Sequence, residues 1–246
     1  MDRLIYTAYS GMAGSVVRER VIASNMANAQ TTGFKAEMLV ATPVTLKGPS
    51  LEARAMSEGE VKGASMVPGA LVATGNPLDV AMAGDAMLAV QAADGSEAYT
   101  RRGDLVVTAE GVLENGEGRP VIGQGGPISV PPGATVTIGA DGSVNVVADG
   151  QPPQAIDRLK LASPAGSKLE KGLDGLFRVA GPAGGALPSD EEAKVVVGSL
   201  EQSNVNPSQV LVSMIEAQRL FDIRTKLVGT AKDLDEGGAS LMRLPS

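Results

Sequence analysis

Residues 203–234, near the C-terminus, carry the strongest periodic signal in the chain. Asn206 is placed to cap a helix, Pro207 suits the first helical position because its missing N–H needs no partner, and Gln209 completes a capping box. Apolar residues then recur at alternating steps of four and three, broken only by Arg224: Val210, Met214, Ala217, Phe221, Val228 and Ala231. This row, called the seam below, predicts a helix of about 40 Å that packs on another apolar surface.

The helix faces on either side of the seam are polar. We expect the other faces of the helix to meet solvent because its flanks carry Glu216, Gln218, Arg219, Asp222 and Lys226. Gly229 weakens the last turns by about 1 kcal/mol relative to Ala, and the pair Gly237-Gly238 predicts the end of the helix. Periodicity alone is equally consistent with a surface helix packed on its own globular domain, so the other end of the chain must decide.

The first thirty residues predict a second amphipathic helix. Their apolar residues follow a three-and-four spacing that is interrupted at Ser15 and Glu19: Ile5, Ala8, Met12, Val16, Ile22 and Met26. Gly11 and Gly14 make this helix weak in isolation, so we expect it to be ordered only when packed, with the C-terminal helix as its mate. Residues 28–33 are polar and turn-forming, and they predict its end.

Between the two helices the pattern changes to short β segments. Residues 35–75 have no sustained period and contain many Gly and Pro, which predicts an extended connector with short strands. From residue 77 to residue 179, apolar runs alternate with turn pairs, as in a small all-β domain. The clearest runs are 80–83, 87–92, 105–108, 135–138, 144–147, 159–162 and, on the return, 195–197; the turn pairs are 94–95, 110–111, 115–116, 141–142 and 149–150.

Together these patterns predict an α+β fold in which the terminal helices pair as a coiled coil and an all-β domain is inserted between them. The expected division is a helix of the coiled-coil domain (1–34), an extended connector (35–75), the all-β domain (76–185), a return connector (186–202) and the second helix (203–246). With only three Tyr, three Phe and no Trp, the core must rely on Val, Leu, Ala and Met, and we expect it to be modest.

The composition also restricts the chemistry. The chain has no histidine and no cysteine, which excludes Ser-His-Asp and Cys-His nucleophile systems and the usual zinc, haem and iron–sulfur ligands. A net charge of −7 without a basic stripe argues against nucleic acid and anionic membranes as partners. No apolar stretch approaches the ~18 residues of a spanning helix, and the N-terminus does not read as a cleavable secretory signal. We expect no cofactor, no metal and no small-molecule substrate.

An enzyme is the remaining alternative from another functional class. Asp79 and Asp85, with Glu110 or Glu114, are candidate carboxylates for glycoside or metal chemistry, although their spacing fits no calcium loop and turn or edge positions explain them more simply. The glycine-rich residues 123–127 lack the Lys-Ser/Thr of a phosphate loop and are interpreted as a turn. A soluble binding module, whose terminal helices pack on their own chain, is a third hypothesis.

Both ends carry recognisable motifs. Residues 23–28 (ASNMAN) followed by 31–35 (TTGFK) look like the N-terminal signature of the bacterial flagellar axial proteins, the rod, hook and hook-junction group. Residues 203–206 (SNVN) with 214–221 (MIEAQRLF) are similar to that family's C-terminal signature. In the middle, residues 77–81 (PLDVA), 99–101 (YTR) and 120–123 (PVIG) resemble the β domain that rod proteins share with the hook protein.

This resemblance implies a structural subunit, without enzymatic activity, of the rod of the bacterial flagellar basal body. It implies a place in the proximal rod, with the distal rod as the alternative, and export to the periplasm by the flagellar type III apparatus. The terminal helices would polymerise with other rod proteins and with copies of the same chain into the hollow shaft that transmits torque for swimming. Residues 25, 28, 33 and 34 could also simply end the first helix.

The assembly contacts that we expect come from both ends of the chain. They are Ile5, Ala8, Met12, Ile22, Asn25, Met26, Asn28, Gly33, Phe34, Ser203, Asn204, Val205, Asn206, Val210, Met214, Ala217, Gln218, Phe221 and Val228.

Overall fold

The computed structural model describes residues 2–45, 55–131, 133–147, 152–164, 166–181 and 185–242. They combine helices and strands, which confirms the predicted α+β class. The chain divides into two compact units. Unit 1 comprises Met1–Ala27, Glu37–Lys62 and Asn206–Ser246, and unit 2 comprises Asn28–Ala36 and Gly63–Val205.

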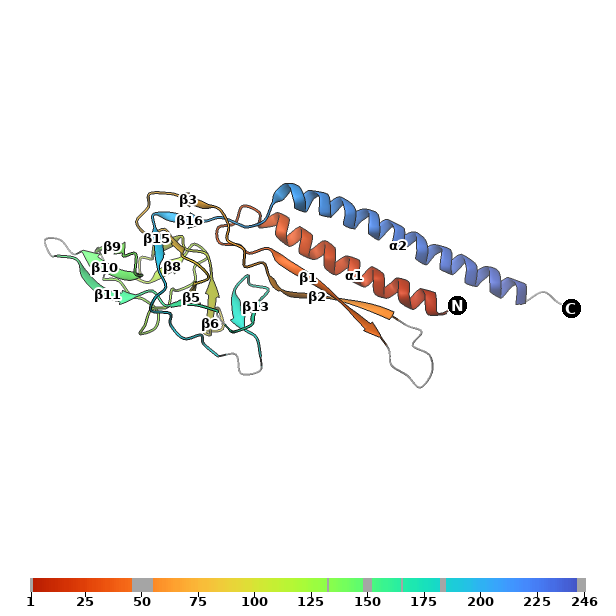
Figure 1. Cartoon of the computed structure of the whole chain (residues 1–246), viewed down its shortest axis with the longest axis horizontal. Coiled ribbons are helices and arrows are strands. Elements are labelled where there is room, and N and C mark those ends of the chain that lie inside the picture. Colours follow the sequence, from red (N-terminus) through yellow and green to blue (C-terminus); the bar gives the residue numbers. More distant parts are fainter. Residues whose placement is uncertain are drawn as a thin grey trace. The chain divides into compact units, whose positions relative to one another are not determined.

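Unit 1 contains the two long helices, α1 (Asp2–Ala27) and α2 (Pro207–Met242), which lie side by side and run in opposite directions (Figure 1). The predicted cap of α2 is confirmed, because the side-chain oxygen of Asn206 accepts hydrogen bonds from the N–H groups of Ser208 (3.0 Å) and Gln209 (3.2 Å). The predicted end at Gly237-Gly238 is wrong, since α2 continues to Met242. Glycine lowers helix propensity but keeps its backbone donor, so the ladder can pass through it.

Unit 1 also contains a two-stranded ribbon of β1 (Glu37–Thr45) and β2 (Ala55–Ala64). These strands are longer than the short strands expected between residues 35 and 75. The Gly and Pro residues of this region do not all interrupt the strands, because Pro43 lies within β1 and Gly59 lies within β2. Proline and glycine are compatible with a two-stranded ribbon because each of its strands has an edge that carries no ladder hydrogen bonds.

Unit 2 is built from short antiparallel strands. Its largest sheet has the order β12-β5-β6-β14-β13, formed by β12 (Leu161–Ala162), β5 (Met87–Gln91), β6 (Glu97–Thr100), β14 (Phe177–Val179) and β13 (Leu169–Lys171). A second sheet, β11-β10-β9, consists of β11 (Gln154–Arg158), β10 (Ser143–Val147) and β9 (Thr135–Ile138). Three pairs complete the unit: β3 (Leu71–Ala73) with β16 (Ser199–Glu201), β4 (Val80–Met82) with β15 (Val195–Val197), and β7 (Leu105–Val107) with β8 (Leu113–Asn115).

Each predicted strand segment of this unit is confirmed, with ends that differ by at most two residues. The core is aliphatic, as the composition predicts, and its fully buried residues include Val80, Leu88, Leu105 and Leu113. A smaller cluster surrounds the aromatic rings of Tyr99 and Phe177. The turn glycines Gly95, Gly111 and Gly142 adopt positive φ as the turn pairs predict. The predicted pair 115–116 is wrong, because Asn115 still belongs to β8 and Gly118, not Gly116, adopts positive φ in the turn that follows. The pair 149–150 lies outside the described residues.

Candidate assembly surface

Helix α2 packs on α1 along the predicted seam. Ala217 is 3% exposed and Ala231 is 6% exposed, whereas Val210, Phe221 and Val228 are half-buried. Met214, in the same row, is 36% exposed. The seam is therefore only partly covered by α1.

Arg224 is the polar member of the seam, and it reaches across to α1. Its guanidinium donates hydrogen bonds to the carbonyl oxygen of Gly11 and to Oγ of Ser15. The predicted apolar row of α1 is therefore wrong at Val16, which is exposed, because the polar Ser15 takes that place and is buried in this contact. Small residues at positions 11 and 15 leave room for the guanidinium. A single polar contact of this kind can determine the register of two helices.

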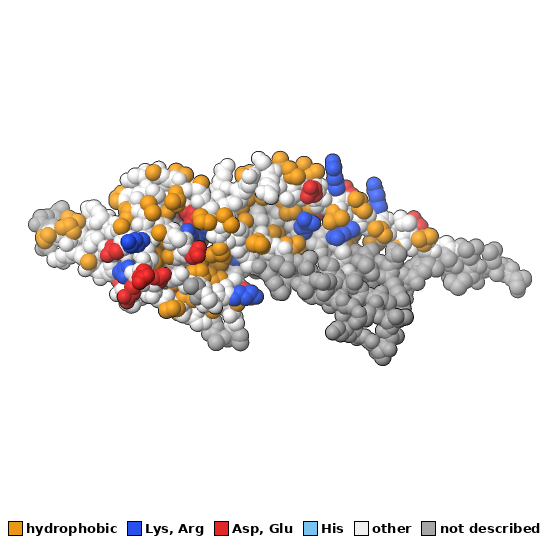
Figure 2. All heavy atoms as spheres, in the orientation of Figure 1, with side chains coloured by type: hydrophobic (Ala, Val, Ile, Leu, Met, Phe, Trp, Pro, Cys, Tyr) orange, Lys and Arg blue, Asp and Glu red, His pale blue; other side chains and the backbone are white. Residues whose placement is uncertain are grey.

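A second apolar row on α2 faces solvent, and the sequence interpretation missed it. Figure 2 shows apolar groups along α2. The large apolar side chains of this row are between 46% and 62% exposed, and they are Leu211, Val212, Ile215, Ile223, Leu227 and Leu234. The sequence does indicate this row, because apolar residues lie four positions apart at 211 and 215 and again at 223 and 227. The polar residues on the flanks of the helix led instead to the expectation of a polar face. Exposed apolar side chains that gather along one helix, here in two groups separated by the polar residues 216, 218, 219 and 222, are typical of a protein-binding surface.

Some of the predicted contact residues of α1 are buried, and others are exposed to solvent. Ile22 is buried and Met12 is half-buried, but Met26 is 40% exposed. Tyr9 is also exposed, although the sequence did not single it out. The side chains of Ile5 and Ala8 lie outside the described residues.

Asn25, in the last turn of α1, has a positioning role inside unit 1. Its side-chain oxygen accepts the N–H of Glu37 (2.8 Å), and its amide group donates to the carbonyl oxygen of the same residue (3.1 Å). Asn25 thus pairs with the first residue of β1 as a neighbouring strand would.

The predicted residues that follow α1 belong to unit 2 and form its entry segment. Asn28 accepts a hydrogen bond from the hydroxyl of Thr31, and the aromatic ring of Phe34 lies 3.5 Å below the ammonium of Lys171. Gly33 is buried with φ of 69°, and its N–H donates to the carbonyl oxygen of Glu201 (2.7 Å).

The matching segment at the other end of unit 2 contains Ser203, Asn204 and Val205. Ser203 Oγ accepts a hydrogen bond from the N–H of Val205, and the side chain of Val205 is buried. Another of the predicted contact residues, Gln218, lies outside this segment on α2 and is exposed. The Asn204 side-chain oxygen accepts the N–H of Ala36 (2.7 Å). Its amide group donates to the carbonyl oxygens of Ser65 and Val67, both at 2.8 Å. The Asn204 side chain therefore joins its own segment to the one at Ala36 and to the one at residues 65–67.

Replacing Asn204 by aspartate is expected to destabilise unit 2 by about 3 kcal/mol, because a carboxylate oxygen would then face the two carbonyl oxygens that now receive N–H bonds. Urea unfolding of the full chain measures this loss. Asn206→Asp is the matched control: aspartate caps a helix as well as asparagine does, so that variant should be near neutral. Equal stability of the two variants would contradict the Asn204 geometry.

A buried ion cluster lies beside Asn204. The carboxylate of Glu201 accepts a hydrogen bond from Lys35 Nζ (2.6 Å) on one oxygen and from Arg101 Nε (2.7 Å) on the other. Gly69 N–H also donates to this carboxylate (2.8 Å). Lys35 and Glu201 are each 1% exposed, and Arg101 is 4% exposed. The sequence did not predict this cluster, since its three charges are more than 60 residues apart.

The remaining donors of the cluster are also used. Lys35 Nζ donates to the carbonyl oxygen of Val67 (2.9 Å), and the Arg101 guanidinium donates to the carbonyl oxygens of Met82, Gly84 and Ala86. Burial lowers the pKa of Lys35 by more than its bond to Glu201 raises it. Burial would raise the pKa of Glu201, but hydrogen bonds from Lys35 and Gly69 and the charge of Arg101 outweigh it, so this pKa is lowered.

Unit 2 is therefore expected to lose stability in acid through this cluster. A carboxyl group whose folded pKa is lowered stabilises the fold above its unfolded pKa of about 4.3, and it loses that contribution as the pH falls through the folded value. The lowered pKa of Lys35 acts in the same direction but at alkaline pH, where the unfolded chain binds more protons than the folded one, so the stability of the unit rises with pH there as well. Unfolding free energies at pH 7, 5 and 3.5 should show the drop in the wild type and a smaller drop in Glu201→Gln.

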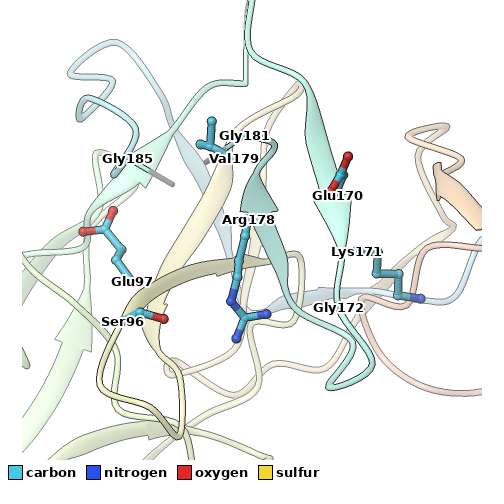
Figure 3. A pocket seen from close by; sticks show the side chains of 9 residues that line it. All are labelled: Ser96, Glu97, Glu170, Lys171, Gly172, Arg178, Val179, Gly181 and Gly185. Carbon is cyan, nitrogen blue, oxygen red and sulfur yellow. The ribbon is translucent and has the colours of Figure 1, made fainter. Parts of the chain in front are cut away.

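The candidate carboxylates for catalysis do not form a site. The Asp79 carboxylate accepts hydrogen bonds from Thr74 and Asn76 in its own turn, and Asp85 is exposed. Neither they nor Glu110 and Glu114 line the pocket in Figure 3. Residues 123–127 form the turn expected of them, with a hydrogen bond from Gly123 N to Gly126 O (2.7 Å).

The pocket in Figure 3 lies against β6, β13 and β14, and its charged side chains are engaged within the chain. Glu97 pairs with Lys160 (2.8 Å), Arg178 pairs with Asp174 (2.7 Å), and Lys171 donates to the carbonyl oxygen of Lys35 (2.9 Å). Among the described residues, no three Asp or Glu side chains gather as metal ligands, and no helix is long and apolar enough to cross a membrane.

Three family models match separate parts of the chain. Residues 5–35 match "Flagella basal body rod protein", residues 81–146 match "Flagellar hook protein FlgE/F/G D1 domain", and residues 196–241 match "Flagellar basal body rod FlgEFG protein C-terminal". The first and last include most of α1 and α2, and the middle model covers strands of unit 2.

Individual relatives match over nearly the whole length. The chain is 41% identical to the flagellar basal-body rod protein FlgF of Salmonella typhimurium, covering 98% of each chain. It is 40% identical to FlgF of Escherichia coli K12, covering 95% of each. Identity to the flagellar basal-body rod protein FlgG of Caulobacter vibrioides is 30%, over 96% of this chain and 97% of the relative.

Proposed function

Since this chain belongs to the family of flagellar basal-body rod proteins, we propose that it is a structural subunit of the proximal rod. The distal rod, the place of FlgG in this family, is less favoured, because identity to the FlgF proteins of Salmonella typhimurium and Escherichia coli is 40–41% and identity to the FlgG relative is 30%. The proteins of this family are structural, so the hypothesis of an enzyme that uses Asp79 and Asp85 is set aside.

The observation that carries the assembly role is the exposed apolar row on α2, from Leu211 to Leu234. Burying this row is favourable by about 25 cal/mol per Å² of apolar surface. Neighbouring subunits, of this chain or of other rod proteins, are the occupants we propose. Because each subunit would offer different faces to its neighbours, the contacts are heterologous and allow open helical growth into a shaft.

Coiled-coil pairing of α1 and α2 is a further part of the proposal. Its support is the seam around Ala217 and Ala231, and the Arg224 contacts with Gly11 and Ser15, which join the helices in one register. The sheets of unit 2 form the inserted all-β domain. We retain the division into 1–34, 35–75, 76–185, 186–202 and 203–246 as the proposed domain organisation, supported by the two compact units.

Export by the flagellar type III apparatus into the periplasm is also proposed, on the family relationship. The net charge of −7 without a basic stripe and the absence of a spanning helix among the described parts of the chain are compatible with it. Apolar residues of α2 are exposed in the free chain, so order in the ends would increase when neighbours bury them.

Photo-crosslinking in cells from a probe at Gln218 tests the assembly role, because this side chain is exposed on α2. Mass spectrometry should identify adducts with other flagellar rod proteins, and their identity would separate a proximal from a distal position. The matched control is a probe at Leu173, an exposed turn residue of unit 2, to report contacts outside the helices. Only intramolecular adducts, in a soluble fraction, would instead support the binding-module hypothesis.

A further inference from the structure

The buried cluster of Lys35, Arg101 and Glu201 has an unusual charge balance. Two cations surround a single carboxylate, and each of the three side chains is almost completely removed from water. A buried charge without a partner is strongly unfavourable, so both cations depend on Glu201. Besides this carboxylate, their hydrogen-bond acceptors among the described residues are backbone carbonyl oxygens, and the one further carboxylate whose charge acts on Lys35, Asp85, is exposed to solvent.

The three members arrive from distant parts of the chain. Lys35 belongs to the entry segment of unit 2, Arg101 follows β6, and Glu201 ends β16, after 200 of the 246 residues. The last segment also makes close backbone contacts: Gly33 N donates to Glu201 O (2.7 Å), and Gln202 N donates to Ala70 O (2.8 Å). A Cβ at Gly69 would lie 1.9 Å from the Gln202 carbonyl oxygen, so the segments touch without intervening side chains.

We propose that Glu201 is a folding gate for unit 2, which reaches its cooperative native fold only when the segment 199–205 closes on Lys35 and Arg101. Before that closure, folding of the preceding strands would bury two positive charges without an anion.

Hydrogen exchange of the purified full chain tests the gate with Glu201→Gln. The informative reporters are β7, β8, β9 and β10, none of which contains a cluster residue. If the unit depends on Glu201 as a whole, protection in these strands should fall about 100- to 1,000-fold, together with protection around residues 35 and 69. Loss confined to the segments that contact Glu201, with normal protection in the four reporter strands, would overturn the gate.

Asp174→Asn is the matched control. Asp174 also forms a close pair with an arginine, Arg178 (2.7 Å), but at a partly exposed hairpin. A surface pair contributes little, so protection in the same reporter strands should change by less than about threefold.

A second variant keeps the test decisive if Glu201→Gln does not fold at all. In Lys35→Met combined with Glu201→Gln, one of the two uncompensated cations is removed, so protection should recover at least about tenfold relative to Glu201→Gln alone. Lys35→Met by itself should have a smaller effect than Glu201→Gln, because it leaves a one-to-one pair of Arg101 and Glu201. If the double variant is as unprotected as the single one, the charge mechanism is wrong.

These measurements use the free chain, so their failure would leave the rod assignment intact. Conversely, a chain that fails to crosslink to rod proteins from Gln218 could still show the gate. The two proposals can therefore fail separately.

Discussion

Replacing Phe221 by aspartate is expected to abolish incorporation of the chain into the basal body and to stop swimming, while unit 2 remains folded. Phe221 is a half-buried member of the seam, one turn after the buried Ala217. Moving a carboxylate into this apolar environment costs about 3 kcal/mol or more, and a pair with Arg224 three residues on would return only about 0.5 kcal/mol. That pair would also compete with the bonds from Arg224 to α1.

The effect is large because the helices have little stability of their own. A helix such as α1, with two internal glycines, depends on its packed face for order. Unit 2 has its own aliphatic core, around residues such as Leu88 and Leu113, and should keep its hydrogen-exchange protection.

Swimming assays and isolation of basal bodies measure the outcome for Phe221→Asp, with Phe221→Leu as the matched control. Leucine keeps an apolar side chain at the same position and should preserve most incorporation. Basal bodies that contain the aspartate variant at wild-type levels would show that Phe221 is not buried in the assembled seam.

Replacing Gly33 by alanine is expected to cost unit 2 about 4 kcal/mol or more, enough to unfold a marginal unit. Gly33 has φ of 69°, where a side chain is strained by about 1–2 kcal/mol. The larger contribution is steric: a Cβ would lie 2.4 Å from the backbone N of Arg102 and 2.5 Å from the carbonyl carbon of Arg101. Relieving that contact would displace the backbone that carries a member of the ion cluster.

Gly95→Ala separates the two causes. Gly95 has φ of 81°, but a Cβ there would meet no atom within 4 Å. Alanine at this position should therefore cost only the backbone strain, about 1–2 kcal/mol. Urea unfolding of both full-length variants gives the difference, and similar losses would rule out the close approach of residues 33 and 101–102.

Several assembly candidates from the sequence turned out to have contacts within the chain. Asn25 and Asn204 bind backbone groups of neighbouring segments, and Gly33 fits where no side chain can. Their assembly role stays a prediction, whereas their local geometry already gives a reason for the residue type at each position. The exposed row on α2 adds residues that the motif-based interpretation did not include.

The sequence by itself determined the helices, the Asn206 cap and most strands, because periodicity, capping and turn preferences act between residues close together in the chain. It did not determine the true end of α2, since the propensity of two glycines is weaker than the continuing helical ladder. Only the tertiary structure decided which face of α1 meets Arg224 and that Lys35, Arg101 and Glu201 share one buried site. Those contacts join residues up to 213 positions apart, and no local pattern encodes the partner of an isolated charge.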